Sequence, residues 1–161
     1  MFVGGWFEDL PRGERKAEAF ALHASLGATI LVLSLIRLGW RLSHPAPPLP
    51  ENYGAGVRFL ARATHVGLYV VMIGMPLTGW AAASTSGRPL PDVWGMIPFP
   101  RLPLQGEGPH ETAEFLHVGL ILNLFWVLIA LHVAGALKHH LFDRDRTLWR
   151  MLPIVTPRGR D

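Results

Sequence analysis

The chain contains no cysteine. Without thiols it can form neither a disulfide nor the thiolate ligands of an iron–sulfur cluster, and a metal ion cannot be bound through Cys. The eight histidines are therefore the main candidate metal ligands, with the five methionines as second candidates. Any metal-based function of this chain must rest mainly on imidazole.

The sequence is also poor in charge. Charged residues make up 17% of it, against about a quarter in a soluble domain. The deficit is concentrated in windows that contain no Asp, Glu, Lys or Arg: 19–36, 63–87 and 115–137. A helix needs about 20 mainly apolar residues to cross a bilayer, so each window predicts one transmembrane helix.

The fold class predicted from these windows is all-α, an integral membrane helical bundle that forms a single domain over residues 1–161. We expect the helices at about 19–38, 61–83 and 113–140. The long outer loop, at about 84–112, is rich in Pro and Gly but also contains Trp94, Met96, Ile97 and Phe99. These apolar residues suggest a cap on the outer membrane surface. The lipid bilayer is the first partner implied, and we expect no nucleic-acid partner.

The placement of the basic residues predicts the orientation, because Lys and Arg accumulate in cytoplasmic loops. The segment between the first two windows and the tail after the third contain Arg37, Arg41, Arg58, Arg62, Lys138, Arg144, Arg146, Arg150, Arg158 and Arg160. The N-terminal segment and the long loop contain only Arg12, Arg15, Lys16, Arg88 and Arg101. The C-terminus is therefore predicted to be cytoplasmic, in a multi-pass membrane protein.

Four histidines fall at two matched depths of the predicted bundle. His23 and His117 lie at the outer level, and His65 and His132 at the inner level. His117 and His132 are separated by about 22 Å of helix and about 60° in azimuth. Two imidazoles that face each other at one depth can bind a haem iron through both axial positions. The pattern predicts two haem sites that carry electrons across the bilayer.

Several alternatives stay open for these residues. A histidine at a helix end can simply reach the headgroups. Zinc would require about four ligands at one level, which two separated pairs do not provide. Gly27 and Gly67 would allow close approach of a flat porphyrin, or serve ordinary helix packing. Arg37 would pair with a haem propionate or anchor the helix at the cytoplasmic surface.

His139 and His140 follow the third window beside Lys138. We interpret them as interfacial residues in contact with a haem propionate rather than as axial ligands. His44 and His110 fall in predicted loops, which makes them weaker candidates for iron ligation.

At this point the chain resembles the bacterial cytochrome b561 family, di-haem membrane proteins of four helices related to the cytochrome b subunits of hydrogenases and formate dehydrogenases. The stretches that carry the resemblance are EDLPRGERK, FALHASLG, LIRLGWRLSHPAPPLP, THVGLYVVMIGMPLTGW and LIALHVAGALKHHLFDRDRTLWRMLP. The resemblance implies that His23 and His117 bind one haem b. It also implies that His132 binds a second haem, with a partner on the family's first helix.

The sequence departs from this pattern in two ways. The family's first helix is missing, since EDLPRGERK should follow it and MFVGGWF would be its remnant; we expect a truncated sequence in which Met1 is an internal methionine. The resemblance also implies a spacing of fourteen residues between the last two ligands, whereas His117 and His132 are fifteen apart. A slight bulge or a helix rotation would absorb the extra residue. In this chain the inner haem would be absent, five-coordinate or bound by His65.

The resemblance implies a multi-pass protein of the bacterial inner membrane. Its expected function is electron transfer between a periplasmic donor and the quinone pool, which consists of ubiquinone or another quinone. Some members of the family oxidise superoxide and reduce ubiquinone, and Arg88 and Arg101 would attract such an anion. The first alternative is a cytochrome b anchor subunit of a periplasmic dehydrogenase or hydrogenase. The second alternative is a membrane scaffold without haem.

Overall fold

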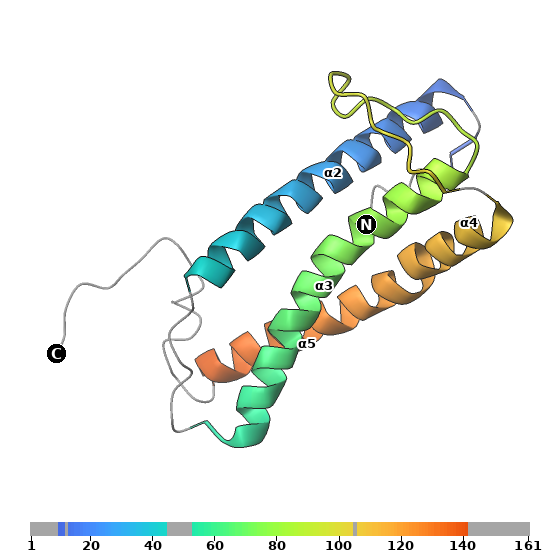
Figure 1. Cartoon of the computed structure of the whole chain (residues 1–161). Coiled ribbons are helices and arrows are strands. Elements are labelled where there is room, and N and C mark those ends of the chain that lie inside the picture. The colour runs from blue at the N-terminus through green and yellow to red at the C-terminus, as the bar shows by residue number, and fades with distance from the viewer. Residues whose placement is uncertain (1–9, 12, 45–52, 105, 142–161) are drawn as a thin grey trace. The chain divides into compact units, whose positions relative to one another are not determined.

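A computed structural model describes residues 10–11, 13–44, 53–104 and 106–141. The helices follow one another along the chain as α2 (Glu14–Ser43), α3 (Ala55–Thr85), α4 (Glu107–Glu114), η1 (Phe115–Ile121) and α5 (Leu122–Leu141). Figure 1 shows this order, with α4, η1 and α5 forming one continuous helical stretch. The described residues contain no β-strand, only an isolated bridge between Val93 and Ile97. The predicted all-α fold is therefore confirmed.

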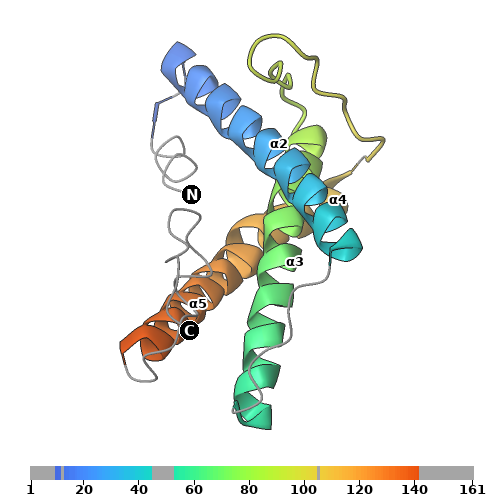
Figure 2. The same ribbon diagram turned by 90° about the vertical axis from the view of Figure 1, so that its left-hand side faces the viewer.

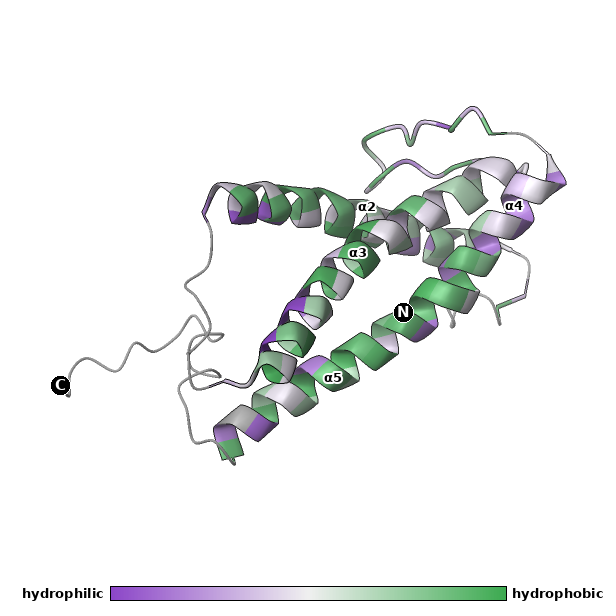
Figure 3. Ribbon diagram, turned by 60° about the horizontal axis from the view of Figure 1, so that its bottom comes forward, coloured by the Kyte–Doolittle hydropathy of each residue, from purple (hydrophilic) through white to green (hydrophobic). Residues whose placement is uncertain are grey.

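Three helices are long and apolar enough to cross a membrane: Glu14–Ser43, Ala55–Thr85 and Glu107–Lys138. They extend beyond the expected ranges at most ends, because charged residues are excluded from lipid but not from a helix. Figure 3 shows mainly hydrophobic residues along α5 and more hydrophilic ones in α4. Many large apolar side chains of the spans are exposed, as the lipid-facing surface of a membrane helix requires.

Local sequence explains where the helices start and stop. Glu14 lies in the first turn of α2 and Arg41 in its last turn, so both charges complement the helix dipole. Glu107 plays the same part in α4, and Pro109 is tolerated because it lies in the first turn. Six residues of the expected loop, 107–112, are therefore helical. Pro76 lies inside α3, a position that membrane helices tolerate when neighbouring groups bond the freed backbone.

The described residues divide into two compact units. The first contains α2, α3 from Tyr69, the outer loop, α4, η1 and α5 to Phe125, and the second contains α3 to Leu68 and α5 from Trp126. Buried side chains are mostly small, among them Ala19, Ser25, Ser34 and Ala113 of the first unit. Small residues let helix backbones approach closely in membrane proteins.

Candidate functional site

The outer histidine pair lies in the first unit, with one ligand candidate from α2 and one from η1. The ring centroids of His23 and His117 are 6.0 Å apart, with the ring planes at 85°. Both side chains are half-buried. An imidazole nitrogen binds a first-row metal at about 2 Å, so two imidazoles on opposite sides of one metal have centroids about 6 Å apart. The spacing of this pair therefore fits two axial ligands of one haem iron.

The His117 ring is held by the backbone of α3. Its Nδ1 lies 2.8 Å from the carbonyl oxygen of Met75 and 3.3 Å from Oγ1 of Thr78. A carbonyl only accepts hydrogen bonds, so Nδ1 carries the hydrogen and donates the hydrogen bond. This tautomer leaves Nε2 with its lone pair available for a metal, which is the arrangement expected of a metal-ligating histidine.

Gly79 allows the His117 ring to lie close against α3. A Cβ atom at Gly79 would lie 2.8 Å from Cε1 and 3.1 Å from Nδ1 of His117. Since Cβ contacts below 3.0 Å do not occur in practice, only glycine allows the ring to lie this close to α3. Neither Gly79 nor the Met75 carbonyl was identified from the sequence. The GMPLTGW stretch was the available signal, because glycine and proline inside a membrane span indicate close backbone approach.

A π-helical segment surrounds His117. The residues of η1, Phe115–Ile121, form this segment between α4 and α5. A π-helical turn accommodates an extra residue within a continuous helix and frequently marks a functional site. The sequence predicted a bulge or rotation from the fifteen-residue spacing of His117 and His132, and the structure has a π-helical bulge that includes His117.

The inner histidine pair lies in the second unit. The ring centroids of His65, on α3, and His132, on α5, are 5.5 Å apart, with the planes at 58°. His65 is exposed and His132 is half-buried. Next to this pair, a Cβ at Gly67 would lie 3.0 Å from Cδ1 of Leu128, so Gly67 faces a packing contact between the same two helices. The structure thus brings together the two histidines that were paired by depth.

The other predicted site residues lie as follows. A Cβ at Gly27 would be 3.9 Å from Cβ of Pro76, an ordinary van der Waals distance between α2 and α3. The Arg37 guanidinium lies 5.7 Å from the Tyr69 ring centroid, in a cation–π contact. His140 is half-buried near the end of α5, and the side chain of His139 lies outside the described residues. The propionate roles of these residues stay predictions.

The outer loop is tied to the end of α3. The guanidinium of Arg101 donates hydrogen bonds to the carbonyl oxygens of Ser84 and Arg88, and the indole Nε1 of Trp80 donates to the carbonyl oxygen of Pro100 at 2.7 Å. His110, on α4, contacts Oγ1 of Thr85 at 3.0 Å through Nδ1. The Arg101 charge is thus fixed at the outer end of α3 rather than carried on a loose side chain.

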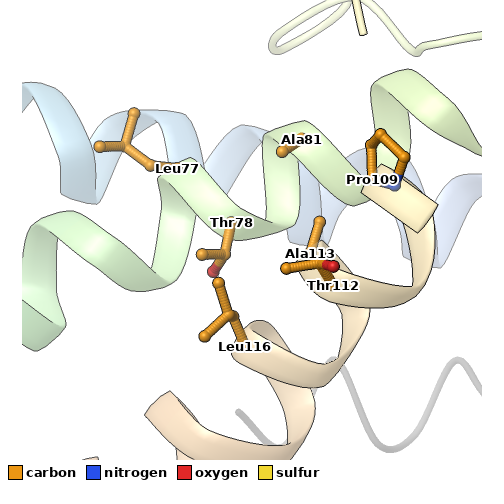
Figure 4. A pocket seen from close by; sticks show the side chains of 7 residues that line it. All are labelled: Leu77, Thr78, Ala81, Pro109, Thr112, Ala113 and Leu116. Atoms are coloured by element: carbon orange, nitrogen blue, oxygen red, sulfur yellow. The ribbon is translucent and has the colours of Figure 1, made fainter. Parts of the chain in front are cut away.

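An apolar groove adjoins the outer pair in the first unit. It has a volume of about 440 Å³ and is lined by Leu77, Thr78, Ala81, Pro109, Thr112, Ala113 and Leu116. Figure 4 shows Thr78 of α3 and Leu116 of η1 pointing toward each other at this groove. Thr78 belongs both to this groove and to the surroundings of His117.

The described part of the chain contains no group of three or more His, Cys, Asp or Glu residues that could hold a metal ion. A haem iron requires only two protein ligands, because the porphyrin supplies the rest. The arrangement of histidines in pairs therefore matches haem ligation better than a structural zinc site, which usually takes four protein ligands.

The chain has relatives among known bacterial proteins. The chain is 32% identical to cytochrome b561 homolog 2 of Escherichia coli (strain K12) over 152 residues, which is 94% of this chain and 74% of that protein. It is 31% identical to the probable superoxide oxidase CybB of Yersinia pestis, over 82% of this chain and 73% of that protein.

A third relative, cytochrome b561 homolog 1 of Escherichia coli (strain K12), is 28% identical over 95% of this chain and 84% of that protein. No solved structure matches the chain significantly. The family model for prokaryotic cytochrome b561 matches residues 1–153, nearly the whole sequence. The chain therefore belongs to the prokaryotic cytochrome b561 family, whose members are b-type haem proteins of bacterial membranes that transfer electrons.

Proposed function

We propose that His23 and His117 are the two axial ligands of a haem b at the outer side of the membrane. The observation that carries this proposal is the 6.0 Å separation of the two ring centroids, together with the Nδ1 hydrogen bond that leaves Nε2 of His117 for the iron. Haem b supplies one-electron transfer when it is bound. The side chains of this protein bind, orient and bury it, and form no bond to a substrate.

Each residue of the outer site has a physical task in this proposal. The Met75 carbonyl accepts a hydrogen bond from the Nδ1–H group of His117, which fixes the ring orientation and raises the basicity of the ligating nitrogen. Gly79 lets the ring seat against α3. The apolar surroundings exclude water, and burial of this kind is one of the factors that set a haem potential.

We further propose that His132 binds a second haem at the inner level, with His65 as the residue that takes the place of a ligand from another helix. Support comes from the 5.5 Å separation of their rings. Arg37 and His140 would each pair with a haem propionate, as predicted from the sequence, and the porphyrin of the outer haem would pass close to Gly27, one turn beyond His23. The C-terminal tail would be cytoplasmic, because it is rich in Lys and Arg. The outer pair would then face the periplasm.

The reaction we propose is the oxidation of superoxide at the outer face coupled to the reduction of ubiquinone or another quinone. Two superoxide anions would lose one electron each and become dioxygen, while one quinone takes up two electrons and two protons and becomes a quinol. The relative named as a probable superoxide oxidase supports this substrate. The apolar groove beside His117 supports a quinone, because an apolar cavity with two threonine hydroxyls suits a quinone ring.

The experiment that tests the haem proposal is a pyridine haemochrome assay of the purified chain, with a reduced-minus-oxidised spectrum. Two b haems per chain would support both histidine pairs. One haem that is lost in His23→Ala and retained in His132→Ala would support the outer pair alone. A colourless protein would contradict the proposal and favour the scaffold without haem.

The quinone proposal needs a variant that leaves the haem in place. Ala81→Leu adds three carbons to the groove wall without touching either histidine, so we expect a lower rate of quinone reduction with unchanged haem content. Ala63→Leu, at an exposed position of the same helix outside the groove, is the matched control. An unchanged rate in Ala81→Leu would exclude this groove as the quinone site.

A second candidate function is that of an anchor subunit for a periplasmic dehydrogenase or hydrogenase. The observation that favours it is the exposure of Met96 and Ile97, at 75% and 61%, on the outer loop. Co-purification of a large soluble subunit would support this function. Superoxide-dependent quinone reduction by the isolated chain would oppose it.

A further inference from the structure

Trp94 connects the outer loop to α2 through two hydrogen bonds. Its backbone N–H donates to Oγ of Ser25 at 2.9 Å, and its indole Nε1–H donates to Oγ1 of Thr29 at 3.1 Å. Trp94 adopts this conformation with a φ of 54°, which is unfavourable for a bulky residue. Strained backbone of this kind persists only where surrounding contacts fix it, and it clusters at functional sites.

The same loop is fixed to α3 at its other end. The contacts are those of Trp80 with Pro100 and of Arg101 with Ser84, together with a hydrogen bond of 3.1 Å from the Leu102 N–H to Oγ of Ser84. Ser25 and Ser84 are both only 2% exposed, so the loop buries its acceptors on each helix. Figure 2 shows the loop leaving the end of α3 and coming close to α2 before it returns toward α4.

The contact with Trp94 does not lie over the ligand on α2. Ser25 and Thr29 follow His23 by two and six residues, which places them roughly 200° and 240° around the helix. His23 therefore points toward His117 from one side of α2, while the loop holds the helix from the other side. A rotation of α2 about its axis would break the Trp94 hydrogen bonds and swing His23 away from His117.

We propose that the outer loop is a brace that sets the rotation of α2, with Trp94 as a positioning residue for the axial ligand His23. The proposal rests on the proposed outer haem. Through Trp80 and Arg101 the brace is anchored on α3, the helix whose Met75 carbonyl and Gly79 orient His117. The positions of His23 and His117 thus both depend on contacts with α3. The 85° angle between their rings is the quantity that the brace sets.

Two readouts test the brace in the full chain. Since the sequence has no cysteine, Glu18→Cys on α2 and Glu111→Cys on α4 allow site-specific spin labelling, and a pulsed-dipolar measurement gives the distance distribution without any need for haem. The electron paramagnetic resonance spectrum of the ferric protein gives the relative orientation of the two imidazole planes. The variants are Trp94→Phe, which removes the indole donor, and the milder Thr29→Val, which removes its acceptor.

Loss of one hydrogen bond should lower the ratio of docked to undocked loop about fivefold. We expect the label distance distribution to broaden and the largest g value of the outer haem to fall, because the rings leave their perpendicular arrangement. Trp40→Phe, at the opposite end of α2 where Trp40 stacks on His44, is the matched control and should change neither readout.

An unchanged distance distribution in both Trp94→Phe and Thr29→Val would overturn the brace, and so would an unchanged g value with a broadened distribution. Failure of the proposed haem site has a different signature. In that case the unmodified chain would show no ferric low-spin signal that depends on His23. The label distances would still report whether the loop holds α2.

Discussion

The outer and inner histidine pairs are alike in spacing but differ in how their rings are held. The outer rings are half-buried and nearly perpendicular, and the His117 ring contacts a backbone carbonyl and a glycine of α3. The inner rings are tilted at 58°, and one of them, His65, is exposed. Ring separation alone therefore does not distinguish a prepared ligand pair from two neighbouring histidines. At His117 the contact between Nδ1 and the Met75 carbonyl fixes the tautomer and orientation of the ring before a metal binds.

The largest expected effect comes from breaking the outer pair. His117→Ala removes one axial ligand, and we expect loss of the outer haem from the purified protein, measured by pyridine haemochrome. His110→Ala is the matched control, since His110 lies about two turns away on the same helical stretch and contacts Thr85 rather than His23. Full haem content in His117→Ala would show that the outer pair is not a ligand pair.

Two variants test whether His132 and His65 of the inner pair bind a haem as the outer pair is proposed to do. His132→Ala should abolish the inner haem signal in the reduced-minus-oxidised spectrum. If His65 is the other axial ligand, His65→Ala should lower the same signal and leave the outer haem intact. Normal inner-haem binding in His65→Ala would contradict ligation by His65 and make its position beside His132 a packing contact.

Gly79, which lies against the His117 ring, and Gly67, which faces Leu128, should respond differently to an added methyl group. In Gly79→Ala the new Cβ lies 2.8 Å from Cε1 of His117, so the ring must move, and we expect roughly tenfold weaker haem retention, the lower end of effects at groups that orient a ligand. Haem transfer to apomyoglobin measures this retention.

Gly67→Ala is the matched substitution at the inner pair. Its Cβ meets the terminal methyl groups of Leu128 at 3.0 and 3.1 Å, which are the flexible end of a side chain. We expect the free energy of unfolding to change by about 1 kcal/mol or less and haem retention to change little. Equal effects of the two substitutions on haem retention would mean that Gly79 acts by packing alone.

The smallest predicted effect concerns Thr78. Its hydroxyl lies 3.3 Å from Nδ1 of His117, farther than the Met75 carbonyl at 2.8 Å. Thr78→Val removes a weak acceptor and makes the ligand slightly less basic, so the outer haem potential should rise by about 20 mV, a small part of the 59 mV that corresponds to a tenfold change for one electron. Redox titration measures this shift, and a lower potential would contradict the assigned direction of the hydrogen bond.

The sequence was sufficient to predict the three spans and the pairing of the four histidines, because charge-free windows and residue depth depend only on position along a helix. The spacing of His117 and His132 also indicated a helix irregularity. The helical start of α4 was missed, since Gly106 and Gly108 suggested a loop while the favourable dipole position of Glu107 was given too little weight. Gly79 and the Met75 carbonyl were missed for another reason: their role depends on how close α3 approaches His117, which no pattern within one helix contains.

The π-helical segment Phe115–Ile121 has a consequence for the history of this chain. An inserted residue in a regular helix turns everything beyond it by about 100°, which in a membrane span would exchange lipid-facing and interior side chains. Here the change is confined to two turns, so the rest of α5 keeps its orientation. Homologous sequences aligned across this point should therefore differ in length by a single residue between the two histidines, and deletion of one residue within the segment should be tolerated where deletion elsewhere in the span is not.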